Sequence, residues 1–298
     1  MISIILPTKN RPHALHKAIK SIIKQTIKPD ELIVVDQSID NSSKNLIDSL
    51  FEINCNIILN YVLDSKIDGL VNAKDFGVNI SKGELILFME DDVVLEVDYL
   101  AEIIKGFEAN PLMVGCCGNI TNHPKYNLLQ KMIFHIFHLS LFKDNRIDFF
   151  GTQYSHDKSF ISTDKICGGI SAWKRDVFNN ISFDTKNNFH MLEDIDFSTR
   201  VASFYGDKLF INLNAKLEHN FSAINREFFG PRQYRKVREY VIYYKKRRSI
   251  KNSLIFFIWL MIGLFFEATF ESLKMKSFSP ILGYFNGLYK GCVEKLIS

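Results

Sequence analysis

The sequence has no cysteine pattern typical of a disulfide framework or a structural zinc site. Its five cysteines are odd in number and include no CxxC pair. Small secreted domains depend on paired cysteines, so we expect a chain that works in a reducing compartment. The first residues form an apolar run without a basic leader or a small-residue cleavage site. We therefore expect no signal peptide and a catalytic part that stays in the cytoplasm.

The common nucleotide-binding motifs are absent as well. No G-x-G-x-x-G follows the first apolar run, and G-x-x-x-x-G-K-[ST] occurs nowhere in the chain. Dinucleotide-binding and P-loop proteins are therefore not indicated. One stretch, residues 226–251, is strongly basic, with ten Lys or Arg against two Glu, but no nucleic-acid-binding motif accompanies it. We expect no nucleic-acid partner.

What is present is the composition of a folded chain, with 47% hydrophobic and 23% charged residues among 298. Such a chain can bury a full core. In its first half, short apolar runs alternate with amphipathic segments in the order strand, helix, strand, helix, strand, helix, strand, which is typical of an α/β fold with a parallel sheet. We predict strands at residues 2–6, 32–35, 57–63, 85–89 and 114–118, and helices at 12–25, 70–80 and 97–107. Residues 119–165 break this alternation around one amphipathic segment, 126–142.

Three adjacent carboxylates, Glu90, Asp91 and Asp92, follow the strand predicted at 85–89. Their mutual repulsion beside a buried strand is costly unless a proton or a divalent cation offsets it. Oxygen ligands suit Mg²⁺ or Mn²⁺, and open α/β sheets bind ligands at the carboxyl ends of their strands. We favour a metal site over the alternative, a solvated acidic turn.

The turns after the first two strands carry further polar groups. Pro7, Thr8, Asn10 and Arg11 precede a predicted helix, where backbone N–H groups and the helix dipole favour an anion such as a phosphate. Asp36 follows the second strand and is placed to accept from a nucleobase N–H or a ribose hydroxyl. A nucleotide bound in this crevice would therefore be held without a glycine-rich loop.

Taken together, these fragments resemble the glycosyltransferase family 2 enzymes, which have the GT-A fold, over about residues 1–250. Each fragment alone is weak, and the resemblance depends on their order and spacing. Two departures are Glu90, where an Asp usually opens the metal motif, and Lys74-Asp75, where Arg-Asn is common. The fragments are Ser3-Ile4-Ile5-Leu6-Pro7-Thr8-Lys9-Asn10-Arg11, Glu31-Leu32-Ile33-Val34-Val35-Asp36-Gln37-Ser38, Gly69-Leu70-Val71-Asn72-Ala73-Lys74-Asp75-Phe76-Gly77, Ser81-Lys82-Gly83-Glu84, Phe88-Met89-Glu90-Asp91-Asp92, Cys167-Gly168-Gly169, Arg175-Asp176-Val177-Phe178, Glu193-Asp194-Ile195-Asp196 and His219.

The resemblance implies roles for particular residues. Asp36 would recognise the base, Asp91 the ribose or the metal, and Asp92 the Mn²⁺ or Mg²⁺ that bridges the donor's two phosphates. A divalent ion would neutralise the charge that develops on the diphosphate leaving group. His219 would be a further metal ligand, against the alternative of a structural histidine, and Lys74 would contact the donor.

The acceptor side of the site would come from residues after 165. Because the family inverts the anomeric centre in one displacement, a base must take the acceptor proton, and we choose Asp194, supported by Glu193. Carboxylates in a first helical turn are also common as simple dipole partners. Gly168 and Gly169 would let the backbone approach the sugar and the acceptor closely, against the alternative of an ordinary turn.

The C-terminal region has a different character. After the basic stretch, residues 252–266 carry no charge. As a helix they reach about 22 Å, short of the roughly 30 Å hydrocarbon core of a bilayer. Glu267 and Glu271 follow, so we expect a segment that lies in the membrane interface, with the cations at 245–248 against anionic headgroups. The alternative is a buried core helix.

We therefore predict a GT-A catalytic domain at residues 1–225, divided into a nucleotide-binding half at 1–118 and an acceptor-binding half at 119–225. Residues 226–298 would be a helical, membrane-associating extension. The predicted activity is metal-dependent, inverting transfer of a sugar from a nucleotide-diphosphate sugar, with a UDP-sugar favoured, to a hydroxyl of a glycan or lipid-linked acceptor. The protein would act at the inner face of the cell membrane, in bacterial surface polysaccharide synthesis. The alternatives are a sugar nucleotidyltransferase and a non-catalytic, membrane-docked binding protein with a degenerate transferase fold.

Overall fold

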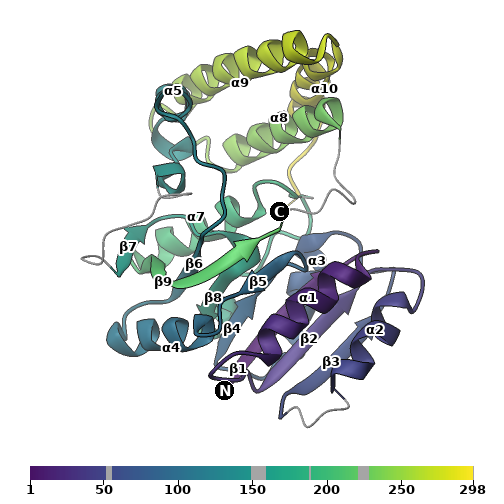
Figure 1. Ribbon diagram of the computed structural model, residues 1–298. Coiled ribbons are helices and arrows are strands. Elements are labelled where there is room, and N and C mark those ends of the chain that lie inside the picture. Colours follow the sequence, from purple (N-terminus) through teal and green to yellow (C-terminus); the bar gives the residue numbers. More distant parts are fainter. Residues whose placement is uncertain (52–55, 149–158, 188, 221–227, 298) are drawn as a thin grey trace.

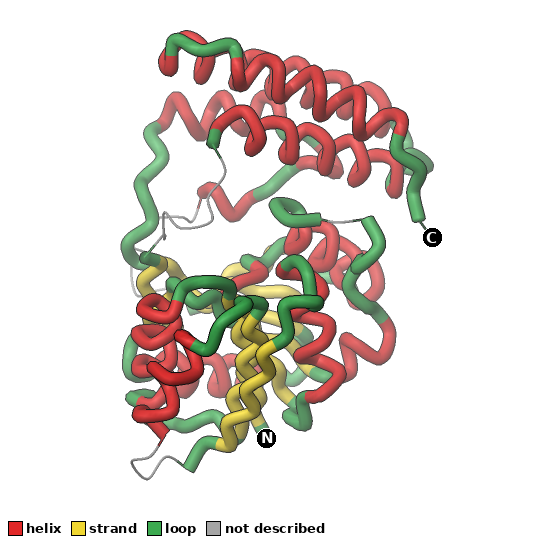
Figure 2. Tube along the Cα trace, turned by 90° about the vertical axis from the view of Figure 1, so that its right-hand side faces the viewer, coloured by secondary structure: helices red, strands yellow, loops and turns green. Residues whose placement is uncertain are grey.

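The computed structural model of this chain describes residues 1–298 except 52–55, 149–158, 188, 221–227 and 298. A central sheet is flanked by helices, and a separate layer of helices from the C-terminal region lies to one side of it (Figure 1). Seen from the side, this helical layer covers the end of the sheet that is opposite the N-terminus (Figure 2). The carboxyl end of β1 (Ile2–Thr8) therefore points toward the layer.

The 9-stranded sheet has the order β3-β2-β1-β4-β8-β6-β9-β5, with β7 paired to β9. Strands β3, β2, β1 and β4 run parallel, and β8 then enters antiparallel to β4. Both β1 and β2 are buried almost throughout, as expected for parallel strands covered on both faces. The strands after β1 are β2 (Glu31–Asp36), β3 (Ile58–Leu63), β4 (Leu85–Phe88), β5 (Val93–Leu95), β6 (Gly115–Ile120), β7 (Phe160–Thr163), β8 (Ser171–Lys174) and β9 (Leu209–His219).

Most helices before residue 221 pack around the sheet, whereas the helix at residues 128–137 lies against a helix of the C-terminal layer. Helix α1 begins with Pro12, whose fixed φ and missing N–H suit a first helical position. Helix α3 follows Gly69, which has a φ of 86° that L-residues rarely adopt. The helices are α1 (Pro12–Ile23), α2 (Ser42–Phe51), α3 (Leu70–Ile80), α4 (Tyr99–Ala109), α5 (Leu128–Phe137), α6 (Asp176–Asn180) and α7 (Glu193–Tyr205), with 3₁₀ turns η1 (Ser140–Phe142), η2 (Asn145–Asp148) and η3 (Gly168–Ile170).

The mixed α/β fold with helices on the sheet confirms the predicted fold class. Helix α2 occupies the place of the helix expected between the second and third strands. Three short strands, β5, β7 and β8, were not predicted, because segments of three or four residues carry too little periodicity. The predicted segment 126–142 forms α5 and η1. The predicted domain boundary at 225 falls within 221–227, outside the described residues.

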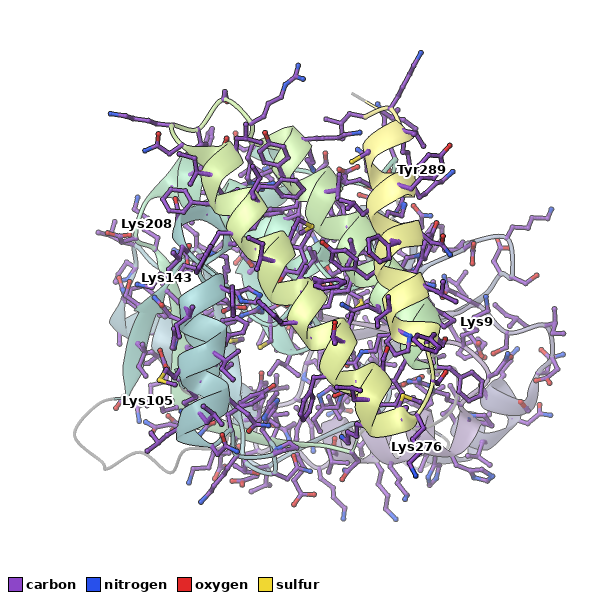
Figure 3. All side chains as sticks on the ribbon, turned by 90° about the horizontal axis from the view of Figure 1, so that it is seen from above. Lys9, Lys105, Lys143, Lys208, Lys276 and Tyr289 are labelled. Atoms are coloured by element: carbon purple, nitrogen blue, oxygen red, sulfur yellow. The ribbon has the colours of Figure 1, made fainter. Side chains whose placement is uncertain are left out.

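The helical layer consists of α8 (Phe229–Lys246), α9 (Ser253–Met275) and α10 (Ser279–Val293). Viewed from above, α9 lies across the layer between α5 and α10 (Figure 3). Residues 252–266 are therefore only part of a 23-residue helix, and the predicted length of about 22 Å is corrected to about 35 Å. Glu267 and Glu271 lie within this helix, and Lys236 on α8 pairs with Glu267 at 2.7 Å.

Helix α9 of this layer and the neighbouring helix α5 together expose many apolar side chains, which we call the apolar face. Among the described residues, α9 is the one helix long and apolar enough to cross a membrane, although 28% of its most apolar 18 residues are buried against protein. Isolated exposed apolar residues are ordinary, whereas a contiguous set this large marks an interaction surface. The apolar face comprises Leu128, Leu129, Met132, Ile133 and Ile136 on α5, and Leu254, Ile255, Ile258, Trp259, Ile262, Phe265, Phe266, Phe270 and Leu273 on α9.

The four cations at 245–248 do not all face outward, which corrects the prediction that they meet headgroups together. Lys246 and Arg247 turn inward to Asp196, at 2.8 Å and 3.1 Å. Lys245 donates to the backbone carbonyls of residues 292 and 294. Of the four, Arg248 is the exposed one. This basic run therefore serves mainly to fasten α8 to its neighbours.

Candidate active site

The predicted polar residues gather where β1, β2 and β4 end. Thr8 ends β1, Asp36 ends β2, and Glu90 to Asp92 follow β4 directly. Because β1 pairs in parallel with both β2 and β4, these ends meet at one edge of the sheet. His219 reaches the same edge as the last residue of β9, opposite Val93 of β5.

Glu90, Asp92 and His219 form a compact group whose ligand atoms all lie within 4.8 Å of one another. The His219 Nε2 atom is 3.0 Å from Asp92 Oδ1 and 3.1 Å from Glu90 Oε2. Burial favours the neutral imidazole, but the hydrogen bonds to Asp92 and Glu90 outweigh it and raise the pKa of His219 to about 9. Two carboxylates and an imidazole are a suitable donor set for Mn²⁺. The sequence predicted a metal site at the three adjacent carboxylates, and whether Glu90 binds the metal or the donor stays a prediction.

Asp91 points away from this group, toward the first turn of the chain. Its carboxylate accepts hydrogen bonds from Thr8 Oγ1 at 2.7 Å and from Arg11 Nη1 at 2.9 Å. Burial raises the pKa of Asp91, and Thr8 and Arg11 oppose that rise. In this structure Asp91 therefore links the carboxylate segment to the turn after β1. Its predicted contact with a metal or a ribose stays a prediction.

A second acidic pair begins helix α7. Glu193 accepts from Lys74 Nζ at 2.5 Å, and the same ammonium donates to the Gly168 carbonyl at 3.0 Å. The side chains of Lys74 and Glu193 are 1% and 7% exposed. Burial raises the pKa of Glu193, although Lys74 opposes that rise. Lys74 thus lies under the site as the counter-ion of Glu193.

Gly168 and Gly169 lie between the two acidic groups. A Cβ atom at position 169 would overlap the Glu90 carboxylate, and one at position 168 would overlap Glu193. The Gly169 carbonyl also accepts from the Glu90 backbone N–H at 2.9 Å. Glycine is required here because both acidic side chains approach the backbone closely.

Asp194 is held by a residue that sequence reasoning missed. Arg146, on η2, donates to Asp194 Oδ2 at 2.6 Å, and its other nitrogens bind Asp144. Only 7% of the Arg146 side chain is exposed. The spacing Asp144-x-Arg146 allows a local ion pair, but nothing in the nearby sequence indicates that Asp194, 48 residues away, completes it.

Glu90 and His219 of the first group and Glu193 and Asp194 of the second line one pocket of about 210 Å³. Its walls combine the metal-ligand candidates with the start of α7, so a ligand placed there would touch both. Two of the histidines in it, together with Met191, were not predicted. The pocket is lined by Leu70, Glu90, Ile120, His123, Cys167, Gly168, Gly169, Ile170, His190, Met191, Glu193, Asp194 and His219.

This arrangement agrees with what the chain is similar to. The model of glycosyl transferase family 2 matches residues 3–181. The chain belongs to glycosyl transferase family 2. Accordingly it is a glycosyltransferase, and the fold and enzyme class predicted from the sequence are confirmed.

Individual relatives of this family 2 glycosyltransferase act in glycan assembly. The GalNAc(5)-diNAcBac-PP-undecaprenol beta-1,3-glucosyltransferase of Campylobacter jejuni is 25% identical over 76% of this chain and 87% of its own length. The O-antigen chain rhamnosyltransferase RfbN of Salmonella typhimurium is 24% identical over 76% and 69%. A solved mannosyltransferase, PcManGT of Pyrobaculum calidifontis in complex with GDP-Man and Mn²⁺, superposes with a TM-score of 0.62 at 15% identity, covering 98% of this chain and 86% of its own. That last likeness shows a shared GT-A fold.

The residues predicted to bind the nucleotide lie at the carboxyl ends of β1 and β2 and in the turns that follow. Asp36 is fully buried and accepts from the Ser38 backbone N–H at 2.9 Å and from the Tyr61 hydroxyl. Asn10 has a left-handed backbone with a φ of 57°, and its N–H donates to Ser38 Oγ at 2.8 Å. Pro7 lies within β1. The two turns are therefore fastened together, and the roles predicted for Pro7, Asn10 and Asp36 in donor binding stay predictions.

The loop before α7 is hydrogen-bonded to helix α8 of the helical layer. Glu239 on α8 accepts three backbone hydrogen bonds, from His190, Met191 and Leu192, at 2.8–3.0 Å. It is fully buried, and burial raises its pKa to about 7 against the opposing effect of those N–H groups. Since this loop leads directly into Glu193, the C-terminal region positions part of the active site.

Proposed function

We propose that this family 2 glycosyltransferase moves a sugar, with inversion, from a nucleotide-diphosphate sugar to a hydroxyl of a glycan or lipid-linked acceptor. A UDP-sugar is the favoured donor. The single observation that carries the proposal is that Glu90 and His219, which form a compact group with Asp92, line one pocket with Glu193 and Asp194. Transfer to a hydroxyl needs charge stabilisation on the leaving side and a base on the acceptor side. The pocket holds candidates for both.

The leaving-group side would use a divalent cation, Mn²⁺ or Mg²⁺, held by Glu90, Asp92 and His219. When bound there, the ion would supply positive charge against the diphosphate that departs. The donor set fits, because the three side chains already converge. Asp92 is itself buried, as are the residues before and after it in the chain. Arg11, 3.6 Å from Asp92, is a further cation near the predicted phosphate site.

The acceptor side would use Asp194 as the general base. Its carboxylate lines the pocket and is oriented by Arg146 at 2.6 Å, while its other oxygen accepts from the Ile195 N–H at 2.7 Å. A base held by fixed hydrogen bonds is preorganised for one proton transfer. Glu193 would support it from the neighbouring position, with its own charge balanced by Lys74.

A direct test is product formation from a panel of nucleotide sugars with Mn²⁺ and with EDTA, with the anomeric configuration of the product read by NMR. Asp92→Asn and Asp194→Asn should each lower kcat by about 10²–10⁴-fold, because each removes one half of the chemistry. The matched control is Asp75→Asn on α3, a part-exposed carboxylate that does not line the pocket. Transfer that survives EDTA, or a product with retained configuration, would contradict the metal-dependent inverting mechanism.

We further propose that the protein docks on the inner face of the cell membrane through the apolar face of α5 and α9, as a peripheral protein. The helical layer supports docking over crossing, because α9 is tied along its length to α8 by the Lys236–Glu267 pair and by Gln233 donating to the Leu264 carbonyl at 3.2 Å. An apolar face of this kind would lie at the boundary between headgroups and acyl chains. A lipid-linked acceptor would then be delivered to the same membrane surface.

Flotation with vesicles of neutral phosphatidylcholine tests this docking. Ile255 and Phe270 on α9 are 65% and 66% exposed, so Ile255→Lys and Phe270→Lys should fold normally. Burying one such apolar side chain in the membrane would contribute about 1.5–3 kcal/mol to the binding free energy. Each substitution removes that contribution and should therefore weaken vesicle binding by about tenfold or more. Leu112→Lys, at an equally exposed site beyond α4, is the control and should float like the wild type. Equal flotation of all variants would exclude the apolar face as the docking surface.

A further inference from the structure

A second and larger cavity has a volume of about 790 Å³. It is lined by the later residues of α7, whereas the active-site pocket is lined by the first residues of that helix. It shares no described lining residue with the active-site pocket. It is bounded by α7, by η1, and by the end of α8 with the turn that follows. Neither donor binding nor the proposed transfer chemistry uses it.

The cavity is rich in cations. Among its described lining residues are Lys165, Arg200, Lys246 and Arg247, with Asp164 as the one carboxylate. Behind the wall, Asp196 is 1% exposed and accepts from Arg200, Lys246 and Arg247.

The anions around the cavity do not balance these cations. Asp164 pairs with Lys165, and Asp184 pairs with Lys246 at 2.6 Å. With Asp196 this gives three carboxylates against four cations, so one positive charge is in excess among these groups.

One of these cations also has an unused donor. Arg200 donates from Nε to Asp196 at 2.9 Å and from Nη1 to the Ser182 carbonyl at 2.7 Å. Its Nη2 atom is buried and has no hydrogen-bond partner among the described residues. Buried polar groups in folded proteins are nearly always paired, and the Arg200 side chain is 29% exposed, so a small turn of its guanidinium would present this donor to an acceptor in the cavity.

We propose that this cavity binds a phosphate-bearing group. A guanidinium with a spare N–H, next to other cations, matches the tetrahedral oxygens of a phosphate, and charge-assisted hydrogen bonds of this kind are strong. The hydroxyls of Ser182, Thr199 and Ser203 line the same cavity and add further polar contacts. The volume exceeds that of a single phosphate and accommodates a diphosphate or a lipid headgroup.

The phosphate has two possible sources, a soluble phosphate compound or the headgroup of a membrane lipid. Ile250 lines the cavity and is 44% exposed, and the chain runs from it directly into α9. The first turn of α9 exposes Leu254 and Ile255, which belong to the apolar face. A headgroup held in the cavity would thus have apolar protein surface nearby for its chain.

Two measurements in EDTA distinguish these sources and do not depend on sugar transfer. The first is the thermal unfolding midpoint with and without pyrophosphate, because a ligand of the native state raises it. The second is flotation with phosphatidylcholine vesicles that contain or lack phosphatidylglycerol. A rise of the midpoint identifies a soluble phosphate ligand, and a gain on phosphatidylglycerol alone identifies a headgroup. No response in either assay overturns the proposal.

Variants assign the response to the cavity. Arg200→Gln should abolish it, whereas Arg248→Gln, which removes an exposed charge outside the cavity lining, should retain it. Since Arg200→Gln also disturbs Asp196, a second variant leaves that network intact. Phe204 lies on the cavity rim and is 62% exposed, so Phe204→Glu should block an anion while Phe204→Gln should not. Equal responses from Phe204→Glu and Phe204→Gln would overturn the proposal.

Discussion

The buried pair of Lys74 and Glu193 gives the sharpest test of how the acidic site is supported. The two side chains are 1% and 7% exposed, and their charged atoms are 2.5 Å apart. Replacing Lys74 with Met keeps much of the volume but leaves Glu193 without a counter-ion. Removing one partner of such a buried pair costs about 3–5 kcal/mol. For a chain of this size we expect the unfolding midpoint to fall by roughly 6–15 °C.

The stability lost in Lys74→Met should depend on pH, because it depends on whether Glu193 is charged. Burial already raises the pKa of Glu193 in the wild type, and Lys74 opposes that rise, so the pKa should climb further in Lys74→Met. A carboxyl whose folded-state pKa lies above its unfolded value is most favourable to stability when protonated. The deficit of the variant should therefore be full above its folded-state pKa and should shrink as the pH falls toward about 4.3, the ordinary value of Glu.

The assay is urea unfolding followed by fluorescence of Trp173, which is buried in the catalytic part, at pH 7.5 and pH 5. The control is the double variant Lys74→Met/Glu193→Leu, which removes both charges and should recover most of the lost stability. If the single and double variants lose the same amount at both pH values, the pair is not coupled and the reasoning fails. A variant with wild-type stability and a raised KM for the donor would instead support the donor contact predicted for Lys74 from the sequence.

Two further predictions concern the walls of the pocket. Gly169→Ala places a methyl group against the Glu90 carboxylate. It should weaken Mn²⁺ binding by about 10–100-fold with little loss of stability. Unchanged affinity in a Mn²⁺ titration would contradict the close approach of Glu90 to the backbone. Glu239→Gln leaves one carbonyl oxygen and an NH₂ group facing three backbone N–H donors. Urea unfolding should show the free energy of unfolding lowered by about 1–3 kcal/mol for each donor left unpaired. Hydrogen exchange at residues 190–192 should rise in that variant but not in Glu239→Asp if the shorter carboxylate keeps its contacts.

The parallel half of the fold was predictable from the sequence because its strands are buried on both faces. Such strands appear as uninterrupted apolar runs, and β1 and β2 were assigned to within two residues at either end. The helix α2 was not assigned bounds, since its first turn consists of Ser, Ser, Lys and Asn, which carry no apolar period. Its place was indicated only by the alternation of strands and helices.

The candidate site was predictable where its residues follow strands and unpredictable where they pair across the chain. Glu90 to Asp92 were located by the predicted strand that they follow, whereas His219, which ends β9, was located by the resemblance to the family. The sequence does not say which of three adjacent carboxylates faces His219, because that depends on the backbone turn after β4. Arg146 was missed because its partner Asp194 lies 48 residues away and leaves no local signal.

The helical layer and α5, which packs against it, support the proposed base Asp194 from two directions. Trp259 on α9 donates to the Ile136 carbonyl of α5 at 2.6 Å, and the chain from α5 leads through η1 to Arg146 on η2, which holds Asp194. Independently, α8 holds the loop before Asp194 through Glu239. The proposed base is therefore fixed from two sides by elements that belong to, or pack against, the helical layer. Because the same layer carries the apolar face, a membrane that reoriented α9 or α5 would act on the acceptor side of the site before the metal-ligand side.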